Sequence, residues 1–176
     1  MRVISGSARG RRLVAPEGRS TRPTHDRVRE ATFNALWSMG ALDGASVLDL
    51  YAGSGALGIE ALSRGAAHAT FVDDDRAAVR AIEANLEACG LSTQAAVVTS
   101  RVERFVAVAD RRWDLALVDP PYELPTDDWL DLLEVLPADL AVLESDREID
   151  PPFGWEVLRA KRYGITHVVI AARMPI

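Results

Sequence analysis

The stretch from Val47 to Ala61 reads V-L-D-L-Y-A-G-S-G-A-L-G-I-E-A and decides the fold of this chain. Its first residues are apolar or β-forming, and they end in a turn, Gly53-Ser54-Gly55, that we call the glycine turn. Apolar residues then recur at helical spacing, so the pattern predicts a strand, a tight turn and a helix. Because glycine tolerates positive φ and lets a ligand approach the main chain, this arrangement is typical of nucleotide-binding corners in open α/β sheets.

The glycine spacing and a nearby acid favour one class of nucleotide. Gly53, Gly55 and Gly58 satisfy the G-x-G-x-x-G pattern of dinucleotide sites, but Asp49 would face a diphosphate with negative charge. A carboxylate at position 49 suits a ligand with a cationic amino-acid group better than it suits a diphosphate. The stretch resembles the cofactor loop of Rossmann-like methyltransferases that use S-adenosylmethionine. The alternative, a turn that only redirects the chain, is less favoured.

The second predicted strand, His68 to Asp73, ends in acids about twenty residues after the glycine turn. A carboxylate at that place accepts both ribose hydroxyls of an adenosine, and we assign this role to Asp73, with Asp74 beside it. Asp75 is a candidate N-cap for the next helix. Arg101 and Val102 follow a third strand, Ala95 to Ser100, and border the adenine in such folds. The predicted cofactor residues are Thr24, Asp49, Tyr51, Ala52, Gly53, Ser54, Gly55, Asp73, Asp74, Arg101, Val102 and Asp119.

The segment L-A-L-V-D-P-P-Y, Leu115 to Tyr122, carries the second chemical pattern. Two prolines end the strand abruptly, because neither offers an amide hydrogen. Asp119, Pro120, Pro121 and Tyr122 therefore lie at its carboxyl end, beside the glycine turn. The motif matches the Asn/Asp-Pro-Pro-Tyr/Phe signature of methyltransferases that act on planar exocyclic nitrogens. A structural Pro-Pro turn is the less favoured alternative.

The chemistry explains these residue types. An exocyclic amine conjugated to a base is a poor nucleophile until hydrogen bonds draw it toward a tetrahedral geometry. The carboxylate of Asp119 and the carbonyl of Pro120 both accept from such an amine, and Tyr122 stacks on a flipped base. Either Asp119 or water takes the proton that is lost after transfer.

The length, hydrophobic content and cysteine count of the chain limit the folds and mechanisms that it can have. The 176 residues, 48% of them hydrophobic, suffice for one domain with a proper core. The single cysteine, Cys89, excludes an internal disulfide and a zinc cluster, and disfavours a pyrimidine-C5 mechanism that needs a cysteine nucleophile. No membrane span and no secretory signal is visible, so we expect a cytoplasmic protein without a metal. Trp113, Trp129 and Trp155 are expected to pack in the core.

Charge is unevenly spread over the chain. Residues 1–29 carry eight arginines against two acids, a net charge of +6, whereas the remainder carries −12. A basic arm on an acidic body is a common footprint of RNA binding. Two short β-like runs, Arg2 to Ile4 and Arg12 to Val14, predict a hairpin. The predicted RNA-binding residues are Arg2, Arg9, Arg11, Arg12, Arg22 and Arg27, and the alternative is a solvated, frayed terminus.

A helix is predicted from Thr24, as N-cap, to about Met39. Val28, Ala31, Ala35 and Leu36, with Phe33 and Trp37 nearby, give it an apolar face. Thr24, Asp26, Arg27 and Arg29 cluster on its first turn, where they either close over the methionine end of the cofactor or form only a cap and surface ion pairs. Later elements are a helix over 127–136, a strand over 140–144 and a strand pair over 155–162 and 165–173. The loop 123–128 is a candidate to move over the substrate.

Together with R-G-R-R-L and R-P-T-x-D-R-V-R-E-x-x-F-N-x-L, both motifs resemble the RsmD family of 16S rRNA guanine-N2 methyltransferases. The resemblance implies a Rossmann-like, seven-stranded, mostly parallel sheet. With the N-terminal hairpin predicted above, we expect residues 1–22 to contact RNA and residues 23–176 to form the methyltransferase domain. The resemblance also implies methyl transfer from S-adenosylmethionine, yielding S-adenosylhomocysteine, to a guanine in the assembled small subunit, at rRNA position 966. The family often has glutamate where this chain has Asp73. We expect a monomer.

Two other functions remain open at this point. A DNA or RNA adenine-N6 or protein glutamine methyltransferase shares the Asp/Asn-Pro-Pro-Tyr motif. However, the DNA enzymes usually need a further recognition region, and the glutamine enzymes favour Asn at position 119. A non-catalytic RNA-binding module is the third possibility, and it predicts no cofactor binding.

Overall fold

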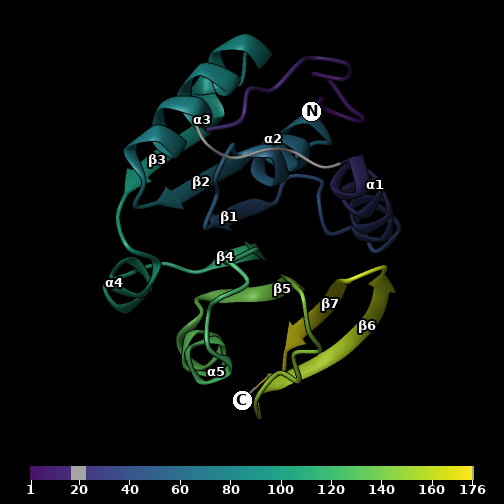
Figure 1. The fold of residues 1–176 in the computed structure, drawn as a ribbon, viewed down its shortest axis with the longest axis vertical. Helices are drawn as coiled ribbons and strands as arrows, with labels where there is room; N and C mark the ends of the chain where they lie inside the picture. Colours follow the sequence, from purple (N-terminus) through teal and green to yellow (C-terminus); the bar gives the residue numbers. More distant parts are fainter. Residues whose placement is uncertain (17–22, 176) are drawn as a thin grey trace.

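The computed structural model describes residues 1–16 and 23–175, and Figure 1 shows their arrangement. The helices are α1 (Pro23–Ser38), α2 (Ala56–Ser63), α3 (Arg76–Cys89), α4 (Val102–Ala107) and α5 (Thr126–Val135), with a short 3₁₀ turn η1 (Ser92–Gln94). The strands are β1 (Ser46–Leu50), β2 (His68–Asp73), β3 (Ala95–Thr99), β4 (Trp113–Val118), β5 (Ala138–Ser145), β6 (Trp155–Tyr163) and β7 (Thr166–Arg173).

The strands form a seven-stranded sheet in the order β3-β2-β1-β4-β5-β7-β6. The first five strands in this order run parallel to one another, and β7 runs antiparallel to both β5 and β6. From β1 the chain adds β2 and β3 on one side, then crosses to β4 and β5 on the other. Ligands bind at such a switch point in open α/β sheets. The predicted Rossmann-like α/β sheet is confirmed.

Helices cover both faces of the sheet, as Figure 1 shows. On one face, α1, α2 and α3 pack over a core that includes Phe33, Ile59 and Ile82. On the other face, α4 and α5 pack over a core that includes Val106 and Trp129. Burial on both sides explains why the central strands read as continuous apolar runs. The three tryptophans predicted to pack, Trp113, Trp129 and Trp155, are buried in the second core.

Three local details bear on the sequence predictions. Asp75 is the N-cap of α3, and its side chain accepts a hydrogen bond from the amide of Ala77, as predicted. The prediction of Thr24 as N-cap is wrong, because α1 already begins at Pro23 and Thr24 lies inside its first turn. Trp37 is 61% exposed and does not belong to the apolar face of α1, so its inclusion there is also wrong. The short helix α4 is not predicted by the sequence.

The N-terminal segment doubles back on itself, as predicted, but forms only one isolated antiparallel bridge, between Arg2 and Arg12. Val3, Ala8 and Leu13 are buried in the same core as α1, α2 and α3. Residues 1–16 are therefore packed on the sheet domain through apolar contacts. The division of the chain at residue 22 stays a prediction.

A buried carboxylate holds this segment in place. Glu60, on α2, accepts hydrogen bonds from the amides of Ile4 (2.8 Å) and Ser5 (3.1 Å), and from Nε of Arg64 (2.7 Å). These three donors compensate the charge of the Glu60 carboxylate, although Glu60 is fully buried. Within the described part of the chain, no helix is long and apolar enough to cross a membrane.

Candidate active site

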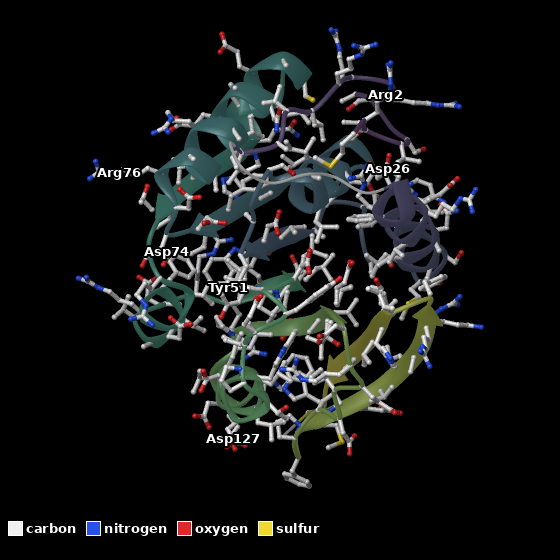
Figure 2. The ribbon with its side chains drawn as sticks, in the orientation of Figure 1. Arg2, Asp26, Tyr51, Asp74, Arg76 and Asp127 are labelled. Carbon is white, nitrogen blue, oxygen red and sulfur yellow. The ribbon has the colours of Figure 1, made fainter. Side chains whose placement is uncertain are left out.

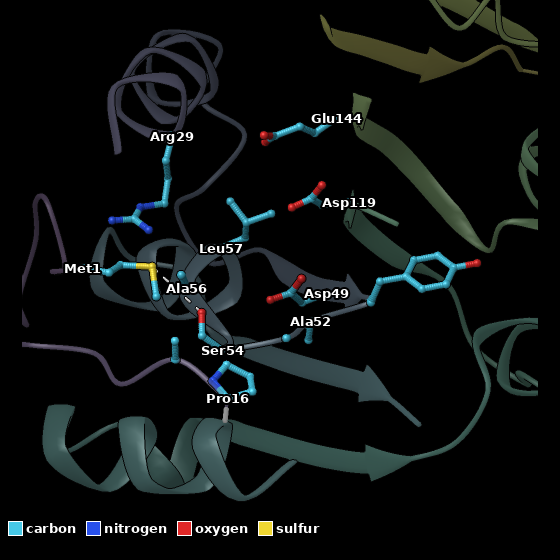
Figure 3. A pocket seen from close by; sticks show the side chains of 13 residues that line it. Met1, Pro16, Arg29, Asp49, Ala52, Ser54, Ala56, Leu57, Asp119 and Glu144 are labelled. Atoms are coloured by element: carbon cyan, nitrogen blue, oxygen red, sulfur yellow. Dashed lines mark hydrogen bonds between the residues drawn. The ribbon is translucent and has the colours of Figure 1, made fainter. Parts of the chain in front are cut away.

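A cavity of about 220 Å³ opens at the switch point between β1 and β4, and Figure 3 shows its walls. We call it the central cavity. It is lined by the glycine turn and its neighbours, by three acids at strand ends, by Arg29 from α1, and by residues of the N-terminal segment. Met1, Ala15 and Pro16 belong to that last group and were not predicted from the sequence.

The glycine turn has the backbone that its sequence predicts. Gly53 (φ 58°) and Gly55 (φ 75°) are left-handed, and Gly55 precedes the first residue of α2. Tyr51, just before the turn, also has a positive φ of 56°, which is uncommon for a residue with a side chain. Such a conformation is typical of functional turns that the surrounding structure holds in place.

Gly58 allows α2 to lie close to the sheet. A Cβ atom built at Gly58 would lie 2.3 Å from Cε1 of Phe71 on β2 and 3.0 Å from Oδ2 of Asp49. The separation from Phe71 is far shorter than a normal contact, and the separation from Asp49 is tighter than most. The third glycine of the pattern therefore serves helix–strand packing, the role it has in dinucleotide folds.

Asp49 lies at the floor of the central cavity and is almost completely buried. Its Oδ2 atom accepts a hydrogen bond from the amide of Gly58 at 2.8 Å. Burial raises the pKa of this carboxyl well above its ordinary value, and Asp119 and Asp73 add to the rise, while the Gly58 amide opposes it. A cationic group bound in the cavity would favour the ionised form.

Asp73 supports the glycine turn from the end of β2. Its two carboxylate oxygens accept hydrogen bonds from the amides of Gly53 (2.8 Å) and Asp75 (3.0 Å). Each carboxylate oxygen has a second lone pair, so these bonds leave capacity for a ribose hydroxyl. The ribose role of Asp73 is not tested by these contacts and stays a prediction.

A second, smaller cavity of about 110 Å³ brings the other predicted adenosine residues together at the ends of β2 and β3. It is lined by Tyr51, Asp73, Asp74, Arg101, Val102 and Glu103. The hydroxyl of Tyr51 donates to Oε1 of Glu103 at 3.2 Å, and burial is the main cause that raises the Tyr51 pKa. Because Tyr51 lines both cavities, the two lie next to each other along the sheet edge.

Asp119 lines the central cavity together with Gly53 and Ser54, so the structure brings the two predicted motifs to one site. The side chain shares a sheet face with Leu117, which packs in the core under α1, α2 and α3. Asp49 shares that face too, since it is in register with Leu117 on β4. Two carboxylates from adjacent strands therefore face the same space (Figure 3).

Glu144, at the end of β5, is a cavity residue that the sequence reasoning missed. Burial raises its pKa from 4.5 to about 8, the nearby Asp119 carboxylate adds to the rise, and the Arg29 guanidinium opposes it. The only signal in the sequence was its place as the last residue of a predicted strand, at the edge where open α/β sheets bind ligands.

Arg29 is a buried cation in this acidic cavity, 4% exposed. One guanidinium nitrogen donates to the Arg2 carbonyl (2.6 Å) and to Asp26 (3.1 Å). Its Nε is buried without a hydrogen-bond partner among the described residues and lies 3.9 Å from Glu60. Three acids and one guanidinium fit a ligand that carries both cationic centres and a carboxylate, as S-adenosylmethionine does.

The remaining predicted residues lie as follows. Pro120 is buried, whereas Pro121 and Tyr122 are exposed. Arg147 donates to the carbonyls of Tyr122 (3.0 Å) and Leu124, which holds the loop after the Asp-Pro-Pro-Tyr motif. The exposed arginines are Arg2, Arg9, Arg11, Arg12 and Arg27. Arg22 and the side chain of Thr24 lie outside the described residues. The described residues contain no group of three His, Cys, Asp or Glu able to hold a metal.

Comparison with known proteins agrees with this geometry. A family model described as "Conserved hypothetical protein 95" matches residues 1–172. The chain is 43% identical over 183 residues to "Putative rRNA methyltransferase YlbH" of Bacillus subtilis, covering 97% of each. It is 38% identical over 179 residues to "Ribosomal RNA small subunit methyltransferase D" of Escherichia coli, covering 93% of this chain and 85% of that protein.

The chain is also similar in structure to a solved protein over nearly its whole length. The "Putative methyltransferase yhhF from Escherichia coli" superposes with a TM-score of 0.85 at 38% identity, over 98% of this chain and 97% of that one. The similarity thus extends over nearly the whole chain.

Proposed function

The chain belongs to the RsmD family of small-subunit rRNA methyltransferases, and on that premise we propose that it methylates the exocyclic N2 atom of a guanine in 16S rRNA. The methyl donor is S-adenosylmethionine and the second product is S-adenosylhomocysteine. The single observation that carries the proposal is that the glycine turn and Asp119 line one cavity at the switch point of the sheet.

The donor fits the residues present. Asp49, Gly53 and Ser54 line the space for its methionine end, and the acids oppose the charge of a sulfonium and an ammonium group. Gly55 follows them in the glycine turn, directly before α2, and keeps its proposed role in donor binding. Asp73 and Asp74, with Arg101 and Val102, line the neighbouring space for the adenosine. When bound, the donor would supply a methyl group attached to a sulfonium, from which the neutral thioether S-adenosylhomocysteine is a good leaving group. Ala52 lines the first of these spaces, and Tyr51 lines both.

The Asp-Pro-Pro-Tyr motif holds the accepting amine. Asp119 and the Pro120 carbonyl accept hydrogen bonds from the guanine amino group, which draws the nitrogen away from planarity. Tyr122, 36% exposed and three residues after Asp119, offers an aromatic face on which the flipped base stacks. Pro121 keeps the turn rigid because its φ is fixed. Holding donor and acceptor together supplies most of the rate acceleration.

The exposed arginines supply affinity for the rRNA backbone. Arg2, Arg9, Arg11 and Arg12 lie on the N-terminal segment, whose Met1, Ala15 and Pro16 also line the central cavity. Arg27 lies on α1, two residues before Arg29, which donates a hydrogen bond to the Arg2 carbonyl of the N-terminal segment. The arm that binds RNA and the wall of the donor site are thus one piece of chain. Arg22 and Thr24 keep their proposed roles in RNA and donor binding.

The test is incubation with labelled S-adenosylmethionine and small subunits from a strain that lacks the activity. We expect label in 16S rRNA, and nucleoside analysis should show N2-methylguanosine. N6-methyladenosine would favour the adenine alternative, and no donor binding by calorimetry would favour a non-catalytic RNA-binding module.

Comparing naked rRNA with the assembled particle tests the proposed particle substrate, and sedimentation tests the proposed monomer. Since ribosomes are the proposed target, we place the enzyme in the cytoplasm.

Asp119→Ala is the matching variant. It should reduce turnover by at least about 100-fold, the lower range for a positioned acid–base group, and weaken donor binding far less than that. Asp131→Ala, an exposed acid on α5, is the control that should change neither. Normal turnover in Asp119→Ala would overturn the assignment of the motif.

A further inference from the structure

Asp119 and Glu144 stand side by side at the carboxyl ends of two neighbouring strands. The register of β4 and β5 pairs Val118 with Leu143, so the next residues on each strand are these two acids. Glu144 shares a sheet face with Val142, which packs in the same core as Leu117 below Asp119. Both carboxylates therefore face the central cavity, as Figure 3 shows.

Glu144 lies on the side of Asp119 that is remote from the donor residues. The sheet order places β2 and β1, with the ribose and glycine residues, on one side of β4, and β5 on the other. None of the residues around the adenosine cavity comes from β5. A base whose amino group reaches Asp119 would thus extend toward β5.

Guanine presents two adjacent donors on that edge. The N2 amino group is next to N1–H, whereas adenine has an acceptor at N1. A carboxylate beside Asp119 can accept from N1–H, and two neighbouring carboxylates together match the donors of guanine. We propose that Glu144 is the residue that recognises guanine, by accepting a hydrogen bond from N1–H while Asp119 accepts from N2. This inference rests on the proposed function.

The charge balance of the cavity is compatible with this role. Glu144 faces Asp119 from β4 and Arg29 from α1, and in the free cavity burial and Asp119 raise its pKa to about 8. A cationic donor next to these acids offsets their mutual repulsion and favours the ionised form. The ionised carboxylate then accepts from N1–H of the base.

The test uses 2-aminopurine, which keeps the methyl-accepting amine of guanine but has an acceptor at N1. Small subunits are reconstituted with 16S rRNA that carries either guanine or 2-aminopurine at the mapped target. The measured quantity is the ratio of kcat/KM for guanine to kcat/KM for 2-aminopurine. The Glu144→Gln side chain has an amide NH2 that donates to the N1 acceptor, so this variant should shift the ratio toward 2-aminopurine by about 10-fold or more. 2-Aminopurine also lacks the O6 atom of guanine, but this loss is the same for the parent enzyme and for Glu144→Gln. The change in the kcat/KM ratio between the two enzymes therefore reports on residue 144.

The outcomes separate this inference from the proposed function. If the parent enzyme methylates guanine but Glu144→Gln leaves the ratio unchanged, the role of Glu144 is wrong and the function stands. If the parent enzyme forms no N2-methylguanosine, both are wrong. Glu156→Gln, an exposed glutamate on β6, is the matched control and should keep the parent ratio. Cooperative thermal unfolding of Glu144→Gln is measured alongside, to establish that the variant is folded.

Discussion

The side-chain amide of Asn85 on α3 joins the N-terminal segment to the glycine turn. Its Nδ2 donates to the carbonyls of Ser54 (2.8 Å) and Val14 (2.9 Å), and its Oδ1 accepts from the Val14 amide (2.8 Å). Asn85 is only 2% exposed. One buried residue therefore connects the proposed RNA-binding arm to the proposed donor loop.

Replacing Asn85 by alanine should weaken both folding and donor binding. The change leaves three buried or half-buried main-chain groups without partners, which costs about 1–3 kcal/mol of stability. Because the Ser54 carbonyl loses its anchor, the Kd for S-adenosylhomocysteine should rise by about 5-fold or more. Urea unfolding and calorimetry measure the two effects. Glu83→Ala, exposed on the same helix, is the control, and equal behaviour of the two variants would contradict the link.

Gly58→Ala should destabilise the protein although alanine favours helices. The added Cβ overlaps the Phe71 ring, and overpacking of this kind costs about 1–3 kcal/mol. Phe71→Leu in the same chain removes the overlap, so the double variant should be more stable than the sum of the two single changes predicts. Urea unfolding of the four proteins gives this coupling. If the changes in unfolding free energy of the two single variants simply add up in the double variant, the Phe71 ring is not the reason that position 58 requires glycine.

Much of the fold follows from local patterns. The strand bounds predicted for β2 match the structure residue for residue, because apolar β-forming residues there are bounded by turn signals and acids. The start of α3 was also predicted correctly, because Asp75 caps the helix within a local sequence pattern. The six-residue helix α4 was missed because two turns of helix carry too little periodicity to stand out.

The site was predictable only where one short segment carries it. The glycine turn and the Asp-Pro-Pro-Tyr motif each show their chemistry within a few residues. Glu144 was missed because its meaning depends on the register between β4 and β5, which is a property of the sheet. For the same reason the sequence did not reveal that Met1 and Pro16 line the cavity, since Glu60 and Asn85 place the N-terminal segment from distant helices.

The arginines of the N-terminal segment should determine the salt dependence of RNA binding. Deleting residues 1–16 would remove Val3 and Leu13 from the core, so charge removal is the sharper change. The triple variant Arg9→Ala, Arg11→Ala, Arg12→Ala should bind 16S rRNA more weakly. Its slope of log K against log salt should fall by about 2–3, at roughly 0.7–0.9 per lost phosphate contact.

The control for this triple variant removes three exposed arginines elsewhere, namely Arg76, Arg80 and Arg104. Figure 2 shows Arg76 on a different part of the surface from Arg2 of the N-terminal segment. The control should keep the parent slope. Equal slopes for both triple variants would mean that the arm does not bind the phosphate backbone.

Glu144→Gln should stabilise the free protein at neutral and alkaline pH. The Glu144 pKa is about 8 in the folded protein and 4.5 in the ordinary case, so the folded state binds a proton more tightly than the unfolded state. The favourable contribution is complete below pH 4.5 and is lost as pH rises through 8. Glutamine keeps the neutral form at every pH, and each 1 kcal/mol gained raises Tm by about 2–4 °C. In thermal unfolding, the Tm of Glu144→Gln should therefore exceed that of the parent by at least about 2–4 °C at pH 9. Near pH 4 the two Tm values should be equal. If the difference between the two proteins does not change with pH, Glu144 is not held at a raised pKa by Asp119 and burial.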